Sequence, residues 1–171
     1  KSMSTAPDVT YGARGGAVDH RRYPLDGRLA DIQRMVTDHG YTAVRVGDRF
    51  GRPEHALRNY DTRHLTIHDS GSADQAVRDH TEAWRLSHEL AHALTLPEVN
   101  SMYGEARRSG RLGAHRTLHE GVRAAHWEWL AGNRQRQLLE AVGAKIPDDV
   151  HNREMNVLMH DAVHRVLTGH P

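Results

Sequence analysis

Apolar residues recur at helical spacing in four stretches of the chain. In residues 25–39 they lie three or four positions apart, and Gly40 follows where a helix C-terminal cap belongs. The same periodicity runs through residues 73–96, 114–142 and 148–167. The pattern therefore predicts four helices, of which the last three are long.

The second predicted helix has clear boundary signals. Ser72 followed by Gln75 matches a capping box, so the helix should begin there. No Gly or Pro interrupts the segment until Pro97, which is expected to end the helix or redirect it.

Two short segments between the first two helices favour strands. Residues 41–46 are rich in β-branched and aromatic side chains, and residues 58–70 alternate in character. In the second segment Leu65, Ile67 and Asp69 would share one face, and His64, Thr66 and His68 the other. Gly47, Gly51 and Pro53 mark the connection between the strands. The predicted class is α+β, mainly helical, with a small sheet before the second helix.

The length of 171 residues fits one domain with a single core. Residues 1–23 contain several Gly and Pro residues and little periodicity, which predicts an N-terminal arm before a domain over residues 24–171. No apolar run approaches the roughly 18 residues of a membrane span, and no signal-peptide core is present. We therefore expect a soluble cytoplasmic protein, and a mature secreted form would look the same.

Composition narrows the chemistry. The chain has no cysteine, which removes disulfides, thiolate metal sites and cysteine nucleophiles, so any metal must be held by His, Asp or Glu. It has 15 His residues, the side chain that most often binds metals in neutral form. Lys and Arg number 23 against 22 acidic residues, so the net charge of +1 argues against binding nucleic acid through a broad positive field.

The motif His88-Glu89-Leu90-Ala91-His92 lies within the second predicted helix. Side chains four residues apart stack on one helix face, so His88 and His92 can bind a single zinc ion. Glu89 can reach a metal-bound water without occupying a ligand position, which makes it a candidate general base for hydrolysis of an amide. His pairs at this spacing recur elsewhere in the chain. The pair alone is therefore a weak signal for a metal site, and Glu89 and the helical context make it specific.

A catalytic zinc needs a third protein ligand, and three residues are candidates. Glu120 lies 28 residues after His92, where a returning antiparallel helix could bring its carboxylate to the His pair, and we rank it first. Glu128 is on the same helix but is rotated by about 80° from Glu120 around the helix axis, and we rank it second. Glu98 resembles the partner of Thr95 in a capping box and is ranked third.

The segment HLTIHDSGSADQAVRDHTEAWRLSHELAHALT, with a strand, a loop and a helix carrying His88, Glu89 and His92, resembles the minimal gluzincins of the ImmA/IrrE and ArdC type. The similarity extends over about residues 40–142. It implies a zincin-like fold, a zinc cofactor, peptidase activity and a third ligand Glu in a later helix, at a spacing that Glu120 matches.

Other histidines and the tryptophans have simpler interpretations. His115, His119 and His126 share one face of the helix that carries Glu120 and could line the cleft, one of them donating to an oxyanion, although hydrogen bonds to neighbours are the more common role. His160 and His164 are interpreted as structural, since Asp161 is the only acidic partner nearby. Trp127 and Trp129 are expected to pack at the core and its rim.

The leading hypothesis is a zinc metallopeptidase acting on a protein or peptide, with a specific regulatory protein as one substrate class. The alternative is a zincin-fold anti-restriction or mobile-element accessory protein that binds DNA without cleaving protein, or a purely structural zinc site. Arg107, Arg108, Arg111 and Arg116 cluster before the third long helix and could contact phosphates. No membrane partner is expected, and the sequence leaves the oligomeric state open.

Overall fold

The computed structural model describes residues 9–10, 17–18, 22–46, 60–105 and 118–168. In chain order its elements are β1 (Val9–Thr10), β2 (Ala17–Val18), α1 (Leu29–Asp38), β3 (Thr42–Val46), β4 (His64–His68), α3 (Gln75–Tyr103), α4 (Leu118–Ala141) and α5 (Asp148–Thr168). The helices dominate, and the parallel β3–β4 sheet precedes the three long ones. The α+β prediction is confirmed.

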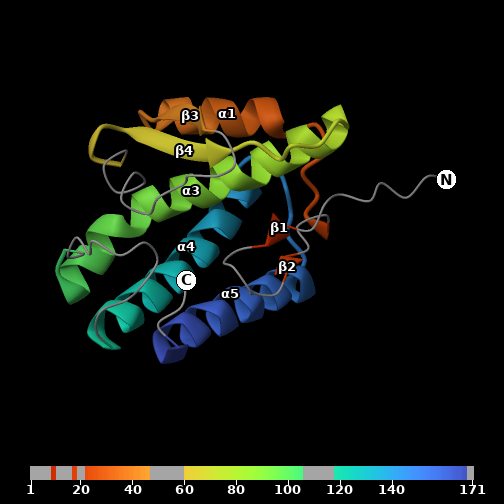
Figure 1. Ribbon diagram of the computed structural model, residues 1–171. Coiled ribbons are helices and arrows are strands. Elements are labelled where there is room, and N and C mark those ends of the chain that lie inside the picture. The colour runs from red at the N-terminus through yellow and green to blue at the C-terminus, as the bar shows by residue number, and fades with distance from the viewer. Residues whose placement is uncertain (1–8, 11–16, 19–21, 47–59, 106–117, 169–171) are drawn as a thin grey trace.

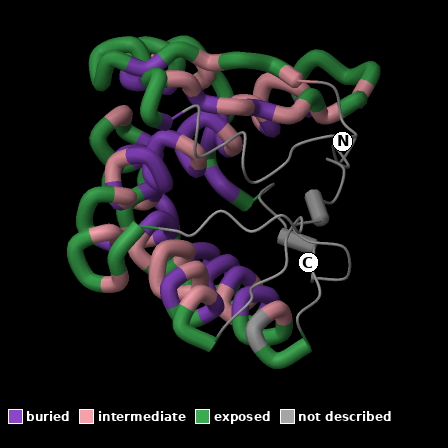
Figure 2. The backbone as a smooth tube through the Cα atoms, turned by 60° about the vertical axis from the view of Figure 1, so that its left-hand side comes forward, coloured by how far each residue is buried: buried purple, intermediate pink, exposed green. Residues whose placement is uncertain are grey.

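Helix α3 lies between two layers (Figure 1). Helix α1 and the β3–β4 sheet pack on one side of it, and α4 packs on the other. Helix α5 packs on α4, and the small antiparallel β1–β2 pair lies beside α5. Figure 2 shows that buried positions concentrate where these layers meet.

Helix α1 and the β3–β4 sheet follow the sequence pattern closely. Helix α1 buries Ile32, Met35 and Val36, and it ends before Gly40, whose φ of +81° is a left-handed conformation that glycine adopts without strain. In β4, Leu65 and Ile67 are buried and the three alternating residues are partly exposed, as predicted. The residues expected to connect β3 with β4, including Gly47, Gly51 and Pro53, lie outside the described part of the chain.

Helix α3 differs from its prediction at both ends. Its N-cap is Asp74, whose carboxylate accepts a hydrogen bond from the Ala76 amide at 2.9 Å, while Ser72 caps the preceding turn through the Asp74 amide. Pro97 does not end the helix, which continues to Tyr103. The turns beyond Pro97 are held by packing, since Val99 is fully buried.

Helices α3, α4 and α5 run antiparallel in succession. Contacts between α3 and α4 pair Tyr103 with His119 and Trp84 with Gln135. Between α4 and α5, a Cβ at Gly132 would lie 2.3 Å from the Met155 sulfur, so any larger residue there would require the Met155 side chain to move. Helix α4 is continuous through Gly132.

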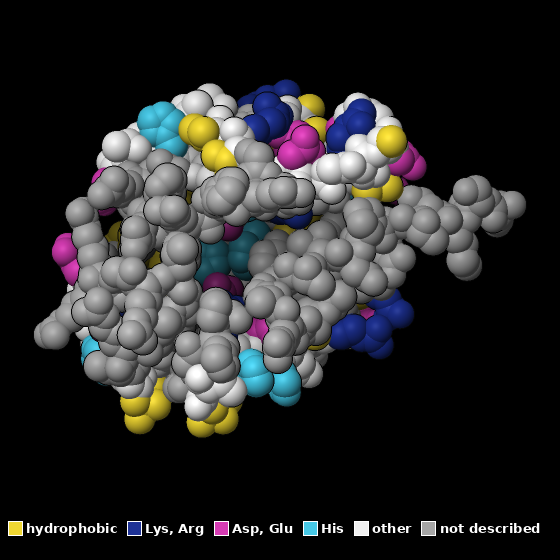
Figure 3. Space-filling model, viewed as in Figure 1, with side chains coloured by type: hydrophobic (Ala, Val, Ile, Leu, Met, Phe, Trp, Pro, Cys, Tyr) yellow, Lys and Arg dark blue, Asp and Glu magenta, His cyan; other side chains and the backbone are white. Residues whose placement is uncertain are grey.

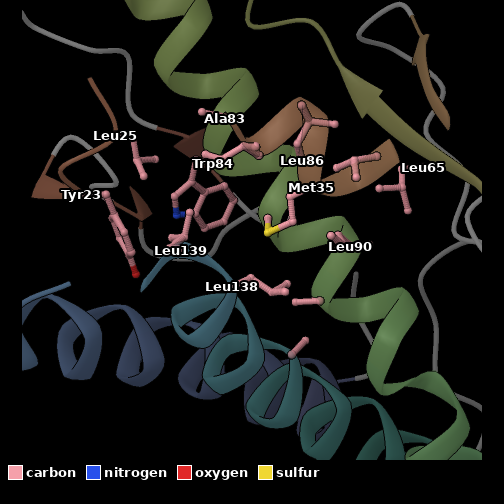
Figure 4. Close-up of a cluster of buried hydrophobic side chains, with 14 of the residues drawn as sticks. Tyr23, Leu25, Met35, Leu65, Ala83, Trp84, Leu86, Leu90, Leu138 and Leu139 are labelled. Carbon is pink, nitrogen blue, oxygen red and sulfur yellow. The ribbon is translucent and has the colours of Figure 1, made fainter. Parts of the chain in front are cut away.

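The hydrophobic core is centred on α3 (Figure 4). Trp84, Leu86 and Leu90 of this helix are almost completely buried, and Leu139 of α4 and Leu65 of β4 close the core from either side. The core contacts thus hold the part of α3 that directly precedes His92. The next part of this helix face packs against α4. Within the described residues, no helix is both long and apolar enough to cross a membrane.

Candidate metal centre

His88 and His92 of α3 bring their imidazoles together as the motif predicts. Their Nε2 atoms lie 3.1 Å apart, and the rings are nearly perpendicular with centroids 4.7 Å apart. Both side chains are buried, with 3% and 6% of the residue surface exposed. Two ring nitrogens therefore point to one place beside the helix.

Glu128 of α4 provides the third group at this place. Its Oε2 lies 3.2 Å from Nε2 of His92 and 3.9 Å from Nε2 of His88. The antiparallel packing of α3 and α4 brings the carboxylate across from the motif. Among the described residues, His88, His92 and Glu128 form the group that could hold a metal ion.

The spacing of these three atoms fits a tetrahedral ion. Ligands at 2.0 to 2.1 Å from zinc in tetrahedral arrangement lie about 3.3 Å from one another. The separations of 3.1, 3.2 and 3.9 Å are close to one face of such a tetrahedron. In the space-filling view, histidine and acidic side chains are visible near the centre of the face shown (Figure 3).

Burial and mutual charge interactions shift the pKa values of Glu128, His92 and His88 in different directions. Burial alone would raise the pKa of Glu128, but the facing imidazoles of His92 and His88 lower it to about 2. Burial would lower the pKa of His92, and the Glu128 carboxylate outweighs this and raises it. Burial and the neighbouring His92 lower the pKa of His88. Near neutral pH the group therefore contains a carboxylate and a neutral His88.

Gln135 of α4 orients His88 from behind. Its side-chain amide donates to the Trp84 carbonyl and the Ser87 hydroxyl, each at 3.1 Å. The amide oxygen is thereby left to accept from Nδ1 of His88 at 3.3 Å. The Trp84 indole stacks on the His88 ring with centroids 4.8 Å apart. With Nδ1 protonated, Nε2 of His88 presents its lone pair toward His92 and Glu128, where a metal ion would bind.

Trp127 supports His92 from α4. Its ring meets the His92 imidazole edge to face at 4.7 Å, and its Nε1 donates to the His92 carbonyl at 3.0 Å. Trp127 is partly buried beside the core, whereas Trp129 is 48% exposed. The neighbour of Glu128 in sequence thus contacts a ligand on the opposite helix.

Glu89 lies on α3 next to this group and is partly exposed. Its Oε2 accepts a hydrogen bond of 2.6 Å from the hydroxyl of Tyr60, which lies four residues before β4. Burial and the Glu89 carboxylate raise the pKa of Tyr60 well above its usual value, so the hydroxyl keeps its proton. Sequence reasoning missed Tyr60, and no local pattern marks it.

The structure groups Glu128, and not the first-ranked Glu120, with the histidines. Because α3 continues eleven residues past His92, its end lies about 16 Å beyond that ligand at 1.5 Å per residue. Glu120 is in the first turn of α4, beside that end. Glu128 lies about 12 Å further along α4 and is level with His92. Glu98 is an exposed residue of α3 beyond Pro97.

His119 and His126 contact the end of α3. The Tyr103 hydroxyl hydrogen-bonds Nδ1 of His126 at 2.6 Å, and Nε2 of His119 lies 3.1 Å from the Tyr103 carbonyl. These contacts fit the ordinary hydrogen-bonding role. His115 lies outside the described residues.

On α5, His160 and His164 are exposed while Asp161 between them is buried. Asp161 thus differs in burial from the two histidines beside it in sequence. The arginine cluster at 107, 108, 111 and 116 lies outside the described residues, so the prediction of a phosphate-contacting surface stays a prediction.

Comparisons with protein-family models, with curated proteins and with solved structures give no match for this chain. The resemblance to the minimal gluzincins therefore rests on the sequence motif and the residue spacing.

Proposed function

We propose that the protein is a zinc-dependent metallopeptidase. The observation that carries this proposal is the convergence of His88 Nε2, His92 Nε2 and Glu128 Oε2, with Glu89 next to His88 on α3. Two imidazoles and one carboxylate are the protein ligands of many catalytic zinc sites, which keep a fourth position open.

The donor set supports zinc over harder ions. Calcium and magnesium prefer six or more oxygen ligands, and this group offers two nitrogens and one carboxylate. Zinc bound there would polarise a substrate carbonyl and lower the pKa of water.

Glu89 is the candidate for proton transfer in this proposal. It is adjacent to His88 in sequence, is partly exposed and hydrogen-bonds Tyr60 rather than either histidine. Its carboxylate is thus available to accept a proton from the attacking water and deliver it to the leaving amine. A metal group used only for structure would not need such a base, so Glu89 favours catalysis over a structural zinc.

The substrate in this proposal is a protein or peptide. The experiment is to measure zinc by elemental analysis of purified protein and to incubate the zinc-loaded chain with a mixed peptide library, reading cleavage by mass spectrometry. Wild type should contain about one zinc per chain and cleave a subset of peptides. Glu89→Gln should keep the zinc and lose the cleavage, and cleavage that persists in this variant would place the chemistry elsewhere.

A further inference from the structure

Tyr60 and Glu89 form a hydrogen bond between two distant parts of the chain. They are 29 positions apart, and the hydroxyl-to-carboxylate distance is 2.6 Å. Among the described residues, Tyr60 alone hydrogen-bonds Glu89. The proposed base is therefore contacted at Oε2, and its Oε1 has no such partner in that part of the structure.

Tyr60 itself is firmly held. Only 7% of its surface is exposed, and its carbonyl accepts from the Arg63 amide at 3.1 Å. Its ring meets that of Trp127 edge to face, with centroids 6.1 Å apart. Trp127 also contacts His92, so one side chain of α4 fixes both the tyrosine and a metal ligand.

In the hydrogen bond between Tyr60 and Glu89, the tyrosine hydroxyl is always the donor. The raised pKa of Tyr60 means that its hydroxyl stays protonated and donates at every pH at which the protein is expected to work. A glutamate side chain that is partly exposed otherwise samples several rotamers, which costs free energy when one of them is needed. A buried donor on one carboxylate oxygen removes this freedom.

We infer that Tyr60 is a positioning residue for the proposed peptidase reaction: its hydroxyl holds Glu89 through Oε2 and leaves Oε1 to accept the proton from the attacking water. This inference rests on the proposed function. Tyr60 acts through Glu89 and does not contact the substrate, so its effect disappears when the base is removed. That dependence separates it from a tyrosine that stabilises the reacting carbonyl directly.

The test uses acetohydroxamic acid, which chelates zinc through two oxygens and gives its hydroxyl proton to a neighbouring carboxylate. Its dissociation constant is measured by calorimetry on zinc-loaded wild type, Tyr60→Phe, Glu89→Gln and the double variant, so no peptidase substrate is required. Hydrogen bonds to charged groups correspond to about tenfold or more in affinity, and Tyr60→Phe should weaken binding by roughly that factor. In the Glu89→Gln background, Tyr60→Phe should cause no further loss.

Tyr103→Phe is the matched control, because it removes a hydroxyl hydrogen bond of the same length to His126 of α4. It should bind the hydroxamate as wild type does. Additive losses in the double variant would show that Tyr60 contacts the ligand itself and would overturn the inference. Unchanged affinity in Tyr60→Phe, or loss of its zinc, would overturn it as well. A wild-type chain that takes up no zinc would instead remove the proposed function on which it rests.

Discussion

His92 of α3 and Glu128 of α4 lie 36 positions apart in sequence, yet Nε2 and Oε2 are 3.2 Å from each other. The pair joins the two helices that pack against each other around the motif. A metal ion at this point would be bound by both helices, so the docking of α4 on α3 and the affinity for the metal are linked.

The first prediction concerns the third ligand. Glu128→Gln should lose most of the zinc affinity, because two remaining ligands hold zinc far less well than three. Glu120→Gln is the control on the same helix and should retain wild-type zinc content. Competition with a chromophoric chelator measures both affinities, and loss of zinc in Glu120→Gln alone would contradict the register of α3 and α4.

The second prediction concerns the orientation of His88. Gln135→Leu replaces the acceptor for Nδ1 with an apolar side chain of similar volume, and it should reduce zinc affinity by roughly 10- to 100-fold. Gln137→Leu, at an exposed position two residues further along α4, serves as the control. Equal zinc affinity in the two variants would show that the hydrogen bond to His88 does not tune the site.

The third prediction is a pH dependence of stability that arises from a buried carboxyl of α5, outside the motif. Glu154 of α5 is 6% exposed, and its buried Oε1 has no hydrogen-bond partner among the described residues. Burial raises its pKa to about 8. The folded chain therefore keeps a proton that the unfolded chain releases from about pH 4.5 upward.

It follows that this carboxyl makes the folded state less stable as pH rises from about 4.5 to 8, at up to about 1.4 kcal/mol per pH unit. Glu154→Gln removes this term, so its unfolding free energy should gain on wild type between pH 5 and pH 8. Urea unfolding at the two pH values measures the difference. The exposed Glu98→Gln is the control and should follow wild type at both.

The fourth prediction tests the close approach of α4 and α5. Gly132→Ala should destabilise the fold by roughly 1 to 3 kcal/mol, because the added methyl group would overlap the Met155 sulfur. Alanine also favours a helix over glycine by up to about 1 kcal/mol, so a net gain in stability would show that Met155 moves aside freely. Chemical unfolding monitored by circular dichroism gives the sign.

Local patterns predicted most of the elements and the two histidines of the centre. The strand face of Leu65 and Ile67, the end of α1 at Gly40 and the helical placement of His88 depend on neighbours within a few residues. Tyr60 could not be found this way, because its role comes from a contact made across 29 positions. The same holds for Gln135, which reaches His88 across 47 positions.

Pro97 shows how tertiary packing can override a local signal. A proline in a helix interior costs about 3 kcal/mol, which is why the helix was expected to end or change direction there. The turns beyond it are stabilised by burial of Val99 and by a hydrogen bond from Arg123 of α4 to Asn100. These contacts are visible only once α4 is placed.

The run of α3 beyond Pro97 also bears on how chains of this architecture can be recognised. Each turn added after His92 moves the start of the returning helix away by about 5.4 Å, and the acidic ligand must then occur about one turn later in that helix. The number of residues between the motif and its third ligand thus measures the length of a helical hairpin. A search with a fixed interval would pass over longer hairpins, whereas one that lets the interval grow by about seven residues for each added pair of turns would retain them.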